Sequence, residues 1–332
     1  MAFSTLLDST LLEQVGSKDA WADFLPHQPR SSTSATIDKD IPTCWLNQFS
    51  ALKIFGPDAE RFLQGQLTCN LNQVTTETVH YGACCNAKGR VVANFNISFD
   101  GENYWLILPS ESADLLEKHL QKYKVFFKAS IENCQQQQLI FGQWLEGTEG
   151  SASHSDAHYL SISDHRRMVI IDAQSEFEFA QLVPTLEWRL ADINDGIHYI
   201  SSDQTQEWLP QHLNWHRLGG ISFNKGCYTG QEIIARLQYL GKAKKALYHY
   251  RGTGLDQTMS LTDNTAQPLY NTAGKNLGEI LFSRHQGIDG AIQLDVLAVL
   301  NTDAPDEILY LTNSMEFPLT LQNISYTEEN TA

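Results

Sequence analysis

The sequence predicts an α+β fold that continues into a small C-terminal β-barrel. Two observations lead to this prediction. Between residues 80 and 127, short strand-like runs are separated by turn residues and followed by a helical pattern. Beyond residue 245, short alternating runs separated by Gly, Asn and Asp dominate, and their close spacing is typical of a small barrel.

Strand pairs with a helix laid across them form the predicted α+β layer. Strands are expected at residues 51–55, 80–86, 90–99, 104–108 and 167–171. The turn Ala87-Lys88-Gly89 joins the second strand to the third, and Asp100-Gly101, a favoured two-residue turn, joins the third to the fourth. Helices are expected from Pro57-Asp58 onward, at residues 112–127, and at residues 176–192 with a stop at Gly196.

Three segments make up the predicted domain organisation. Residues 26–40 are rich in Pro, Ser and Thr, so residues 1–43 are expected to form a flexible lead-in. Residues 44–244 form the α+β region, with a break between two subdomains near residues 147–158, where small polar residues dominate. Residues 245–332 form the barrel. Its strands are expected at residues 246–250, 278–282, 292–300 and 308–311.

Charge and hydropathy exclude several classes of protein. The 332 residues carry a net charge of −16, which argues against a broad phosphate-binding face because nucleic-acid affinity depends on clustered Lys and Arg. No direct nucleic-acid partner is therefore expected. The N-terminus lacks a basic start followed by an apolar run, and no run of 18 apolar residues occurs. We expect a cytoplasmic protein with no membrane segment.

The cysteines do not form a metal-binding pattern. The six cysteines are Cys44, Cys69, Cys84, Cys85, Cys134 and Cys227. No two of them have C-x-x-C spacing, and the adjacent pair at 84 and 85 does not supply an ordinary zinc half-site. We therefore expect reduced thiols, no metal site, and no stable iron–sulfur cluster in the isolated protein.

The segment from Lys225 to Glu232, Lys-Gly-Cys-Tyr-Thr-Gly-Gln-Glu, carries the strongest functional pattern. Its glycines allow positive φ and a close approach of the backbone to a ligand. A helix is predicted to start around Thr229 or Gly230, which places Cys227 just before a helix N-terminus. The helix dipole and the nearby Lys225 ammonium are expected to stabilise a thiolate and lower the pKa of Cys227, as in a reactive cysteine. The alternative is a small thiol that simply fits a glycine-rich turn.

With the preceding Leu-Gly-Gly-Ile-Ser-Phe, this segment closely resembles the signature of the YgfZ family, a branch of the folate-binding group that includes the glycine-cleavage T-protein. Weaker similarity runs from about Phe49 to Ile131, notably at residues 62–68 and 87–89, and continues through Trp188 into the C-terminal region. The resemblance therefore covers nearly all of the predicted folded region. It implies a T-protein-like fold, with subdomains arranged in a ring around a central folate-binding hole.

The resemblance also implies site residues. The family's function depends on the residue that stands at Cys227, and the neighbouring Lys225 is the second catalytic candidate. Tetrahydrofolate is expected to contact Trp188, Phe49, Tyr228, Gln231 and Glu232. An aromatic ring stacked on a flat pterin is physically sensible, yet Trp188 is equally well explained as a core residue of its helix. Phe49 stands where relatives can carry a Trp. Glu232 is either a ligand-contacting carboxylate or a first-turn acid that favours the helix dipole.

The function implied by the resemblance is that of a folate-binding accessory protein. The family is linked to assembly or repair of iron–sulfur proteins and, through them, to tRNA modification. A monomer is expected, with iron–sulfur proteins such as tRNA-thiolation enzymes as partners. The alternatives are a folate-dependent one-carbon transferase and a non-catalytic folate sensor.

One departure from the T-protein bears on these alternatives. Where that enzyme carries paired acids after the glycine turn, this chain has Val92 and Ala93. A carboxylate is the natural group to hold an amine-bearing folate adduct. Aminomethyltransferase activity is therefore not expected, and whether the chain is an enzyme stays open.

Overall fold

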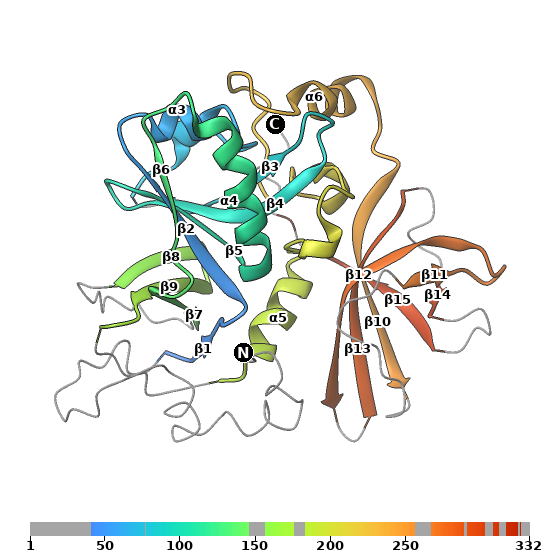
Figure 1. The fold of residues 1–332 in the computed structure, drawn as a ribbon. Helices are drawn as coiled ribbons and strands as arrows, with labels where there is room; N and C mark the ends of the chain where they lie inside the picture. The colour runs from blue at the N-terminus through green and yellow to red at the C-terminus, as the bar shows by residue number, and fades with distance from the viewer. Residues whose placement is uncertain are drawn as a thin grey trace, which may run out of the picture. The chain divides into compact units, whose positions relative to one another are not determined.

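Figure 1 shows the fold as a computed structural model. It describes residues 41–76, 78–145, 157–175, 183–255, 267–288, 291–302, 308–311, 317–324 and 326. Most of the predicted lead-in, most of the predicted break near residues 147–158, and the first part of the predicted helix at 176–192 lie outside the described residues.

The chain divides into two compact units. The first comprises Met1–Phe62, Leu71–His80 and Phe95–Arg189, and the second comprises Leu63–Asn70, Tyr81–Asn94 and Leu190–Ala332. The domain boundaries predicted at residues 44 and 244 stay a prediction.

A five-stranded antiparallel sheet, in the order β3-β4-β5-β2-β6, confirms the predicted α+β layer. Its strands are β2 (Phe49–Phe55), β3 (His80–Cys85), β4 (Val91–Phe99), β5 (Tyr104–Pro109) and β6 (Ser130–Asn133). Leu106 of β5 stands between Leu52 of β2 and Ile97 of β4 in the register. Helix α4 (Ser110–Lys124) lies against β2, β5 and β6 and buries Leu116 and Leu120. The predicted strands and this helix are thus present, with ends displaced by at most three residues.

A second sheet, in the order β1-β7-β9-β8, belongs to the first unit. Its strands are β1 (Thr43–Trp45), β7 (Gln138–Trp144), β8 (Ala157–Ser163) and β9 (Arg166–Asp172). Helix α5 (Thr185–Asn194) replaces the predicted helix over 176–192, of which residues 176–182 are not described. The helix ends shortly before Gly196, which has a φ of 66° that favours glycine and so confirms the predicted stop.

The C-terminal part of the second unit is a closed antiparallel barrel in the order β10-β13-β12-β11-β14-β15, as predicted. Its strands are β10 (Lys245–Leu255), β11 (Pro268–Tyr270), β12 (Asn276–Ile288), β13 (Ala291–Asn301), β14 (Leu309–Tyr310) and β15 (Pro318–Gln322). The buried carboxylate of Asp295 accepts a 2.7 Å hydrogen bond from the Arg251 guanidinium at its Oδ1 atom. Nε2 of His249 lies 2.7 Å from the same oxygen. A buried charge requires such partners, since it has lost its hydration.

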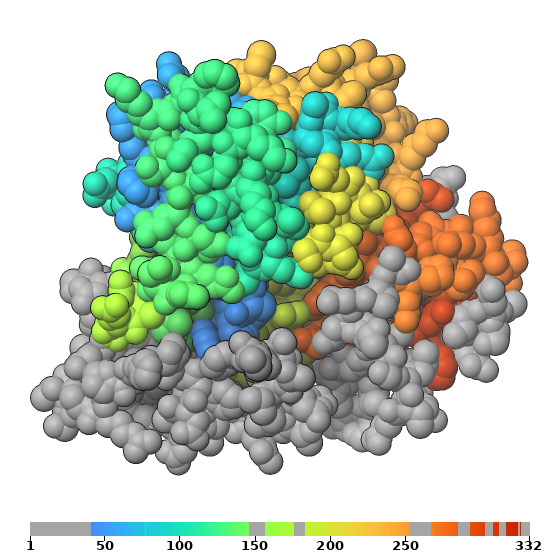
Figure 2. Space-filling model, in the orientation of Figure 1, coloured from blue at the N-terminus to red at the C-terminus, as the bar shows by residue number. Residues whose placement is uncertain are grey.

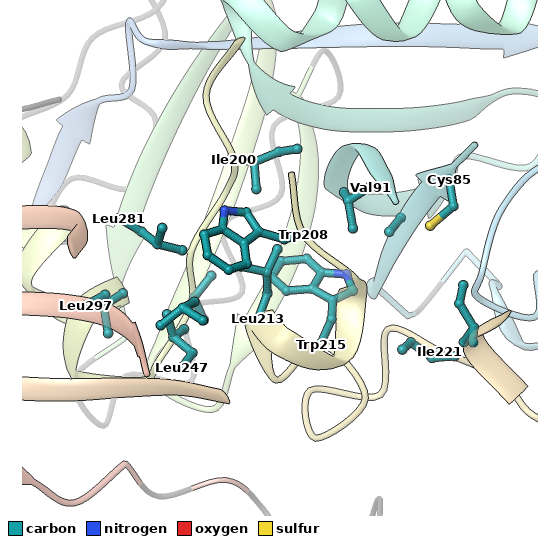
Figure 3. Close-up of a cluster of buried hydrophobic side chains, with 14 of the residues drawn as sticks. Cys85, Val91, Ile200, Trp208, Leu213, Trp215, Ile221, Leu247, Leu281 and Leu297 are labelled. Atoms are coloured by element: carbon teal, nitrogen blue, oxygen red, sulfur yellow. The ribbon is translucent and has the colours of Figure 1, made fainter. Parts of the chain in front are cut away.

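A large apolar cluster lies within the second unit (Figure 3), and the barrel has a second one of its own. The indole rings of Trp208 and Trp215 stand at the centre of the first cluster, with Leu247 of the barrel on one side and Val91 and Cys85 on the other. Clusters of this kind supply most of the favourable free energy of folding.

The remaining helical elements are short. They are α3 (Ala59–Gln64), η1 (Leu71–Gln73), η2 (Ser202–Gln204), η3 (Pro210–Leu213) and α6 (Gln231–Leu240). Across the described part of the chain, every helix is too short or too polar to cross a membrane.

Candidate functional site

Residues 219–230, here called the motif loop, run in irregular backbone from Gly219 to the start of α6. They lie on residues 65–69, here called the anchor segment, which also belong to the second unit. The backbone N–H of Ser222 donates to the carbonyl of Thr68 at 2.9 Å, and the Thr68 hydroxyl donates to the carbonyl of Gly220 at 2.6 Å. The Thr68 hydroxyl also accepts the N–H of Ala83 at 2.9 Å. A single threonine therefore joins the motif loop to β3.

The glycine pair at the start of the motif loop has a packing reason. A Cβ atom on Gly220 would stand 2.3 Å from the Trp215 indole, far closer than non-bonded carbon atoms approach. The indole N–H of Trp215 donates to the carbonyl of Gly82 at 3.0 Å, which holds the ring in place. Gly219 has a φ of 74°, a conformation that favours glycine. Both glycines thus allow the loop to turn tightly against a fixed tryptophan.

Lys225 fastens the middle of the motif loop. Its ammonium donates to the backbone carbonyls of Leu67 at 2.8 Å and Cys69 at 2.6 Å, and it lies 5.2 Å from the centre of the Tyr228 ring. Burial lowers the pKa of Lys225 to about 8, and the nearby Cys69 thiol opposes this shift. The hydrogen bonds of this ammonium go to these two carbonyls, and its expected stabilisation of a Cys227 thiolate stays a prediction.

Cys227 is the exposed cysteine of the six, and the other five are buried. This exposure favours an accessible thiol, and the two interpretations of Cys227 both stay open. Helix α6 begins at Gln231 with Gly230 as its N-cap, one or two residues later than predicted. Cys227 precedes that cap by three residues, as expected for a thiol just ahead of a helix N-terminus.

Tyr228 is buried, whereas the neighbouring Cys227 is exposed. It belongs to the apolar cluster of the second unit, and its hydroxyl has no hydrogen-bond partner among the described residues. Burial raises the pKa of Tyr228, and the thiols of Cys85 and Cys69 add to this effect. An unpartnered buried hydroxyl is costly, so this atom is suited to a ligand or a water molecule.

The end of the motif loop lies on the turn at residues 86–89. Gly230 has a φ of 85°, and a Cβ atom there would stand 2.6 Å from the carbonyl oxygen of Asn86 and 3.0 Å from the Cα atom of Gly89. The neighbouring Thr229 donates its N–H to the carbonyl of Gly65 at 3.1 Å and bonds the Gln66 side chain at 3.3 Å. The three segments that carry the family resemblance, 62–68, 87–89 and 225–232, therefore meet in space.

The remaining predicted residues of this segment are more exposed. Gln231 is half-buried and Glu232 is exposed in the first turn of α6, where a carboxylate favours the helix dipole. The two interpretations of Glu232 both stay open. Sequence reasoning did not single out Gln66, Thr68 or Asn86, whose only signal was the weak similarity around 62–68 and 87–89.

Trp188 and Phe49 lie in the first unit and share one apolar cluster. Trp188 is 0% exposed, and the guanidinium of Arg166 lies 4.6 Å from the centre of its ring. A Cβ atom on Gly142 would stand 2.3 Å from the same ring. The structure therefore places Trp188 as a core residue, the second of its two interpretations, and its contact with folate stays a prediction.

Two further observations concern chemistry. Val92 and Ala93 are buried in β4, so apolar side chains occupy the positions that were compared with the paired acids of the T-protein. Among the residues that the structure describes, no group of three or more His, Cys, Asp or Glu side chains could hold a metal ion.

Comparison with known proteins identifies the family of the chain. No protein-family model matches the chain. It is 30% identical over 315 residues to the tRNA-modifying protein YgfZ of Yersinia enterocolitica, covering 85% of this chain and 91% of that protein. The YgfZ protein of Colwellia psychrerythraea is 29% identical over 306 residues, covering 85% and 92%. The chain belongs to the YgfZ family.

The fold of this YgfZ-family chain is also found among solved structures. It is similar to the glycine cleavage system aminomethyltransferase T from Bartonella henselae, with a TM-score of 0.58, 10% identity and 88% of each chain covered. At this identity the likeness concerns the fold alone. It confirms the prediction of a T-protein-like α+β fold with a C-terminal barrel.

Proposed function

We propose that this YgfZ-family chain is a folate-binding accessory protein that supports assembly or repair of iron–sulfur enzymes and thereby tRNA modification, with Cys227 as its reactive thiol. The observation that carries the proposal is the exposure of Cys227 in a loop that is fastened on both sides. The relatives named tRNA-modifying proteins support the connection to tRNA.

The fastening matters because a functional side chain must be held by its neighbours. Lys225 is bonded to the anchor segment two residues before the thiol, and Thr229 is bonded to it two residues after. Such support reduces the freedom of the intervening backbone and holds the thiol in one place. We propose that the protein acts in the cytoplasm, as a monomer, on iron–sulfur proteins such as tRNA-thiolation enzymes.

Buried polar atoms without partners support the fit to folate. Among the described residues, Trp188 Nε1 in the first unit and the Tyr228 hydroxyl in the second are buried and make no hydrogen bond. A pterin offers ring nitrogens and a carbonyl that donate and accept hydrogen bonds, which suits such atoms. In the second unit, Tyr228, Gln231 and Glu232 are the residues that would hold it. The expected contacts of Trp188 and Phe49, which belong to the first unit, stay predictions. Bound tetrahydrofolate would supply a reduced pterin able to carry one-carbon groups.

The apolar positions in β4 favour an accessory role over aminomethyl transfer. Val92 and Ala93 are buried and uncharged, so they offer no carboxylate to an amine-bearing adduct.

The test replaces Cys227 with Ser in cells that lack the native protein. We expect thiolated tRNA nucleosides, measured by mass spectrometry, to fall to the level of cells without the protein, while tetrahydrofolate binding is retained. Gly226→Ala is the matched control, because a Cβ atom at Gly226 meets nothing within 4 Å and the thiol remains. Full support of thiolation by the Cys227→Ser variant would show that the thiol is not required.

A further inference from the structure

Helix α6 carries an unusually exposed apolar face. Of its ten residues only Ile234 is buried. Ile233, Tyr239 and Leu240 are 36%, 64% and 84% exposed. Ile233 and Leu240 are seven residues apart and so lie on one side of the helix. Figure 2 shows the gold residues of α6 on the outer surface of this face of the molecule.

Two of these exposed apolar residues, which lie on different sides of α6, contact neighbouring segments. The ring of Tyr239 packs edge-on against Phe223 of the motif loop, with 6.0 Å between ring centres. The side chain of Ile233 lies against Gly89 of the turn at 86–89. The exposed apolar groups of α6 are therefore attached to the same loop and turn that position Cys227. Apolar groups that remain exposed on an ordered helix mark an interaction surface more often than isolated ones do.

Positive charge surrounds these apolar groups. Arg236, Lys242 and Lys244 are all exposed. None of the three forms an ion pair with an Asp or Glu among the described residues. The only acid on α6, Glu232, stands at the other end of the helix from the two lysines. In a chain with a net charge of −16, three exposed cations thus lie on or just after α6, without an acidic partner among the described residues.

We propose that the exposed face of α6 and the basic residues that follow it form a docking surface for a protein partner. The partner's surface would carry an apolar hollow bordered by Asp and Glu side chains. An apolar centre with a charged rim is the usual anatomy of a protein interface, and Tyr and Arg are favoured anchor residues there. The unpaired cations give the rim charge complementarity to an acidic partner.

A protein partner fits this surface better than a nucleic acid. Ile233 and Leu240 are aliphatic and cannot stack on bases, whereas single-stranded nucleic acids are held on aromatic rings within a basic groove. Tyr239 has its ring engaged with Phe223. The strongly negative chain would also repel a long polyanion that approached the few cations of this surface.

The surface lies close to the thiol. Cys227 precedes the first residue of α6 by four positions, and a ten-residue helix is about 15 Å long. A partner docked on α6 would therefore have Cys227 at its edge. This part of the inference rests on the proposed function, because it identifies the surface through which the accessory protein meets its client.

A photo-cross-linking amino acid in place of Tyr239 tests the proposal in cells expressing the full chain. The control is the same amino acid in place of Ile308, which is 47% exposed in the barrel. We expect a protein cross-link at 239 that is absent at 308 and that mass spectrometry identifies. The double variant Lys242→Glu/Lys244→Glu should reduce it at least about fivefold, because rim charges govern association. Lys118→Glu/Lys275→Glu, with the same change in net charge at other exposed sites, should not.

Binding experiments with the purified partner then test the charge complementarity of the two surfaces. Reversing its acidic residues at the cross-linked site should restore binding to the Lys242→Glu/Lys244→Glu variant, as measured by calorimetry. Four outcomes would overturn the proposal. They are a cross-link to RNA, a cross-link to the chain itself, a protein cross-link insensitive to charge reversal, and no cross-link above the control. If docking fails while Cys227→Ser still abolishes tRNA thiolation, only the docking surface is wrong. If docking holds while Cys227→Ser is active, only the thiol's role is wrong.

Discussion

The ammonium group of Lys225 donates a 2.6 Å hydrogen bond to the backbone carbonyl of Cys69. These residues are separated by 156 positions in the chain, and the bond joins the motif loop to the anchor segment. The same ammonium also donates to the carbonyl of Leu67, so the lysine is bonded to the anchor segment at two points. Its position two residues before Cys227 therefore fixes the backbone that carries the thiol.

Removing this ammonium should destabilise the protein. Lys225→Met keeps the apolar stem but leaves two backbone carbonyls without their donor. We expect the free energy of unfolding to fall by about 1–3 kcal/mol, the usual cost of losing hydrogen bonds to a charged group. Urea denaturation measures the change. Lys88→Met, at an exposed lysine of the neighbouring turn, should stay within about 0.5 kcal/mol of the parent. Equal effects of both substitutions would contradict the fastening role.

The same lysine predicts a pH dependence. Burial lowers its pKa from 10.5 to about 8 in the folded chain. Between these values the unfolded chain holds a proton that the folded chain has lost, so the free energy of unfolding should rise with pH across this window. The difference between the parent and Lys225→Met isolates this group, because other residues titrate alike in both. That difference should move in favour of the parent between pH 8 and 10, and a constant difference would refute the assignment.

Two glycines of the motif loop should respond differently to the same change. Gly230→Ala introduces a Cβ atom 2.6 Å from the carbonyl oxygen of Asn86 at a φ of 85°. The left-handed backbone alone costs a non-glycine residue about 1–2 kcal/mol, and the clash adds to this. We expect a clear loss in the midpoint of thermal unfolding. Gly226→Ala meets nothing within 4 Å and should be tolerated. A harmless Gly230→Ala substitution would mean that the loop does not lie on the turn at 86–89.

Thiol alkylation should single out one cysteine. Burial raises the pKa of Cys69 and Cys134 to about 11 and that of Cys84 to about 12. At pH 8 a thiol with a pKa of about 11 is ionised to about one part in a thousand, and burial also blocks the reagent. Iodoacetamide should therefore modify Cys227 first, as followed by mass spectrometry. The fast phase should vanish in Cys227→Ser; a fast phase that persists there would show that another thiol is accessible.

Tetrahydrofolate should bind the intact chain and quench its tryptophan fluorescence. If Trp188 is the contact in the first unit, Trp188→Phe should remove much of the quenching. Trp208→Phe is the matched control, since Trp208 is also buried but belongs to the core of the second unit. The absence of any heat of binding at millimolar ligand would remove folate from the proposed function.

Local patterns in the sequence predicted most of the secondary structure of this protein. The alternation in the barrel strands, the turn at residues 87–89 and the helix over 112–127 each depend on steric preferences of neighbouring residues, which act over a few positions. The eight residues from Lys225 to Glu232 likewise carried the family membership, because their order alone is specific.

Tertiary structure decided what those residues do. The sequence could not show that the Lys225 ammonium bonds to the backbone of residues 67 and 69, since main-chain carbonyls are identical at every position. Nor could composition show that Cys227 is exposed while Trp188 is enclosed in a core. Burial depends on which distant segments pack together, and that packing arises from the chain as a whole rather than from any local period.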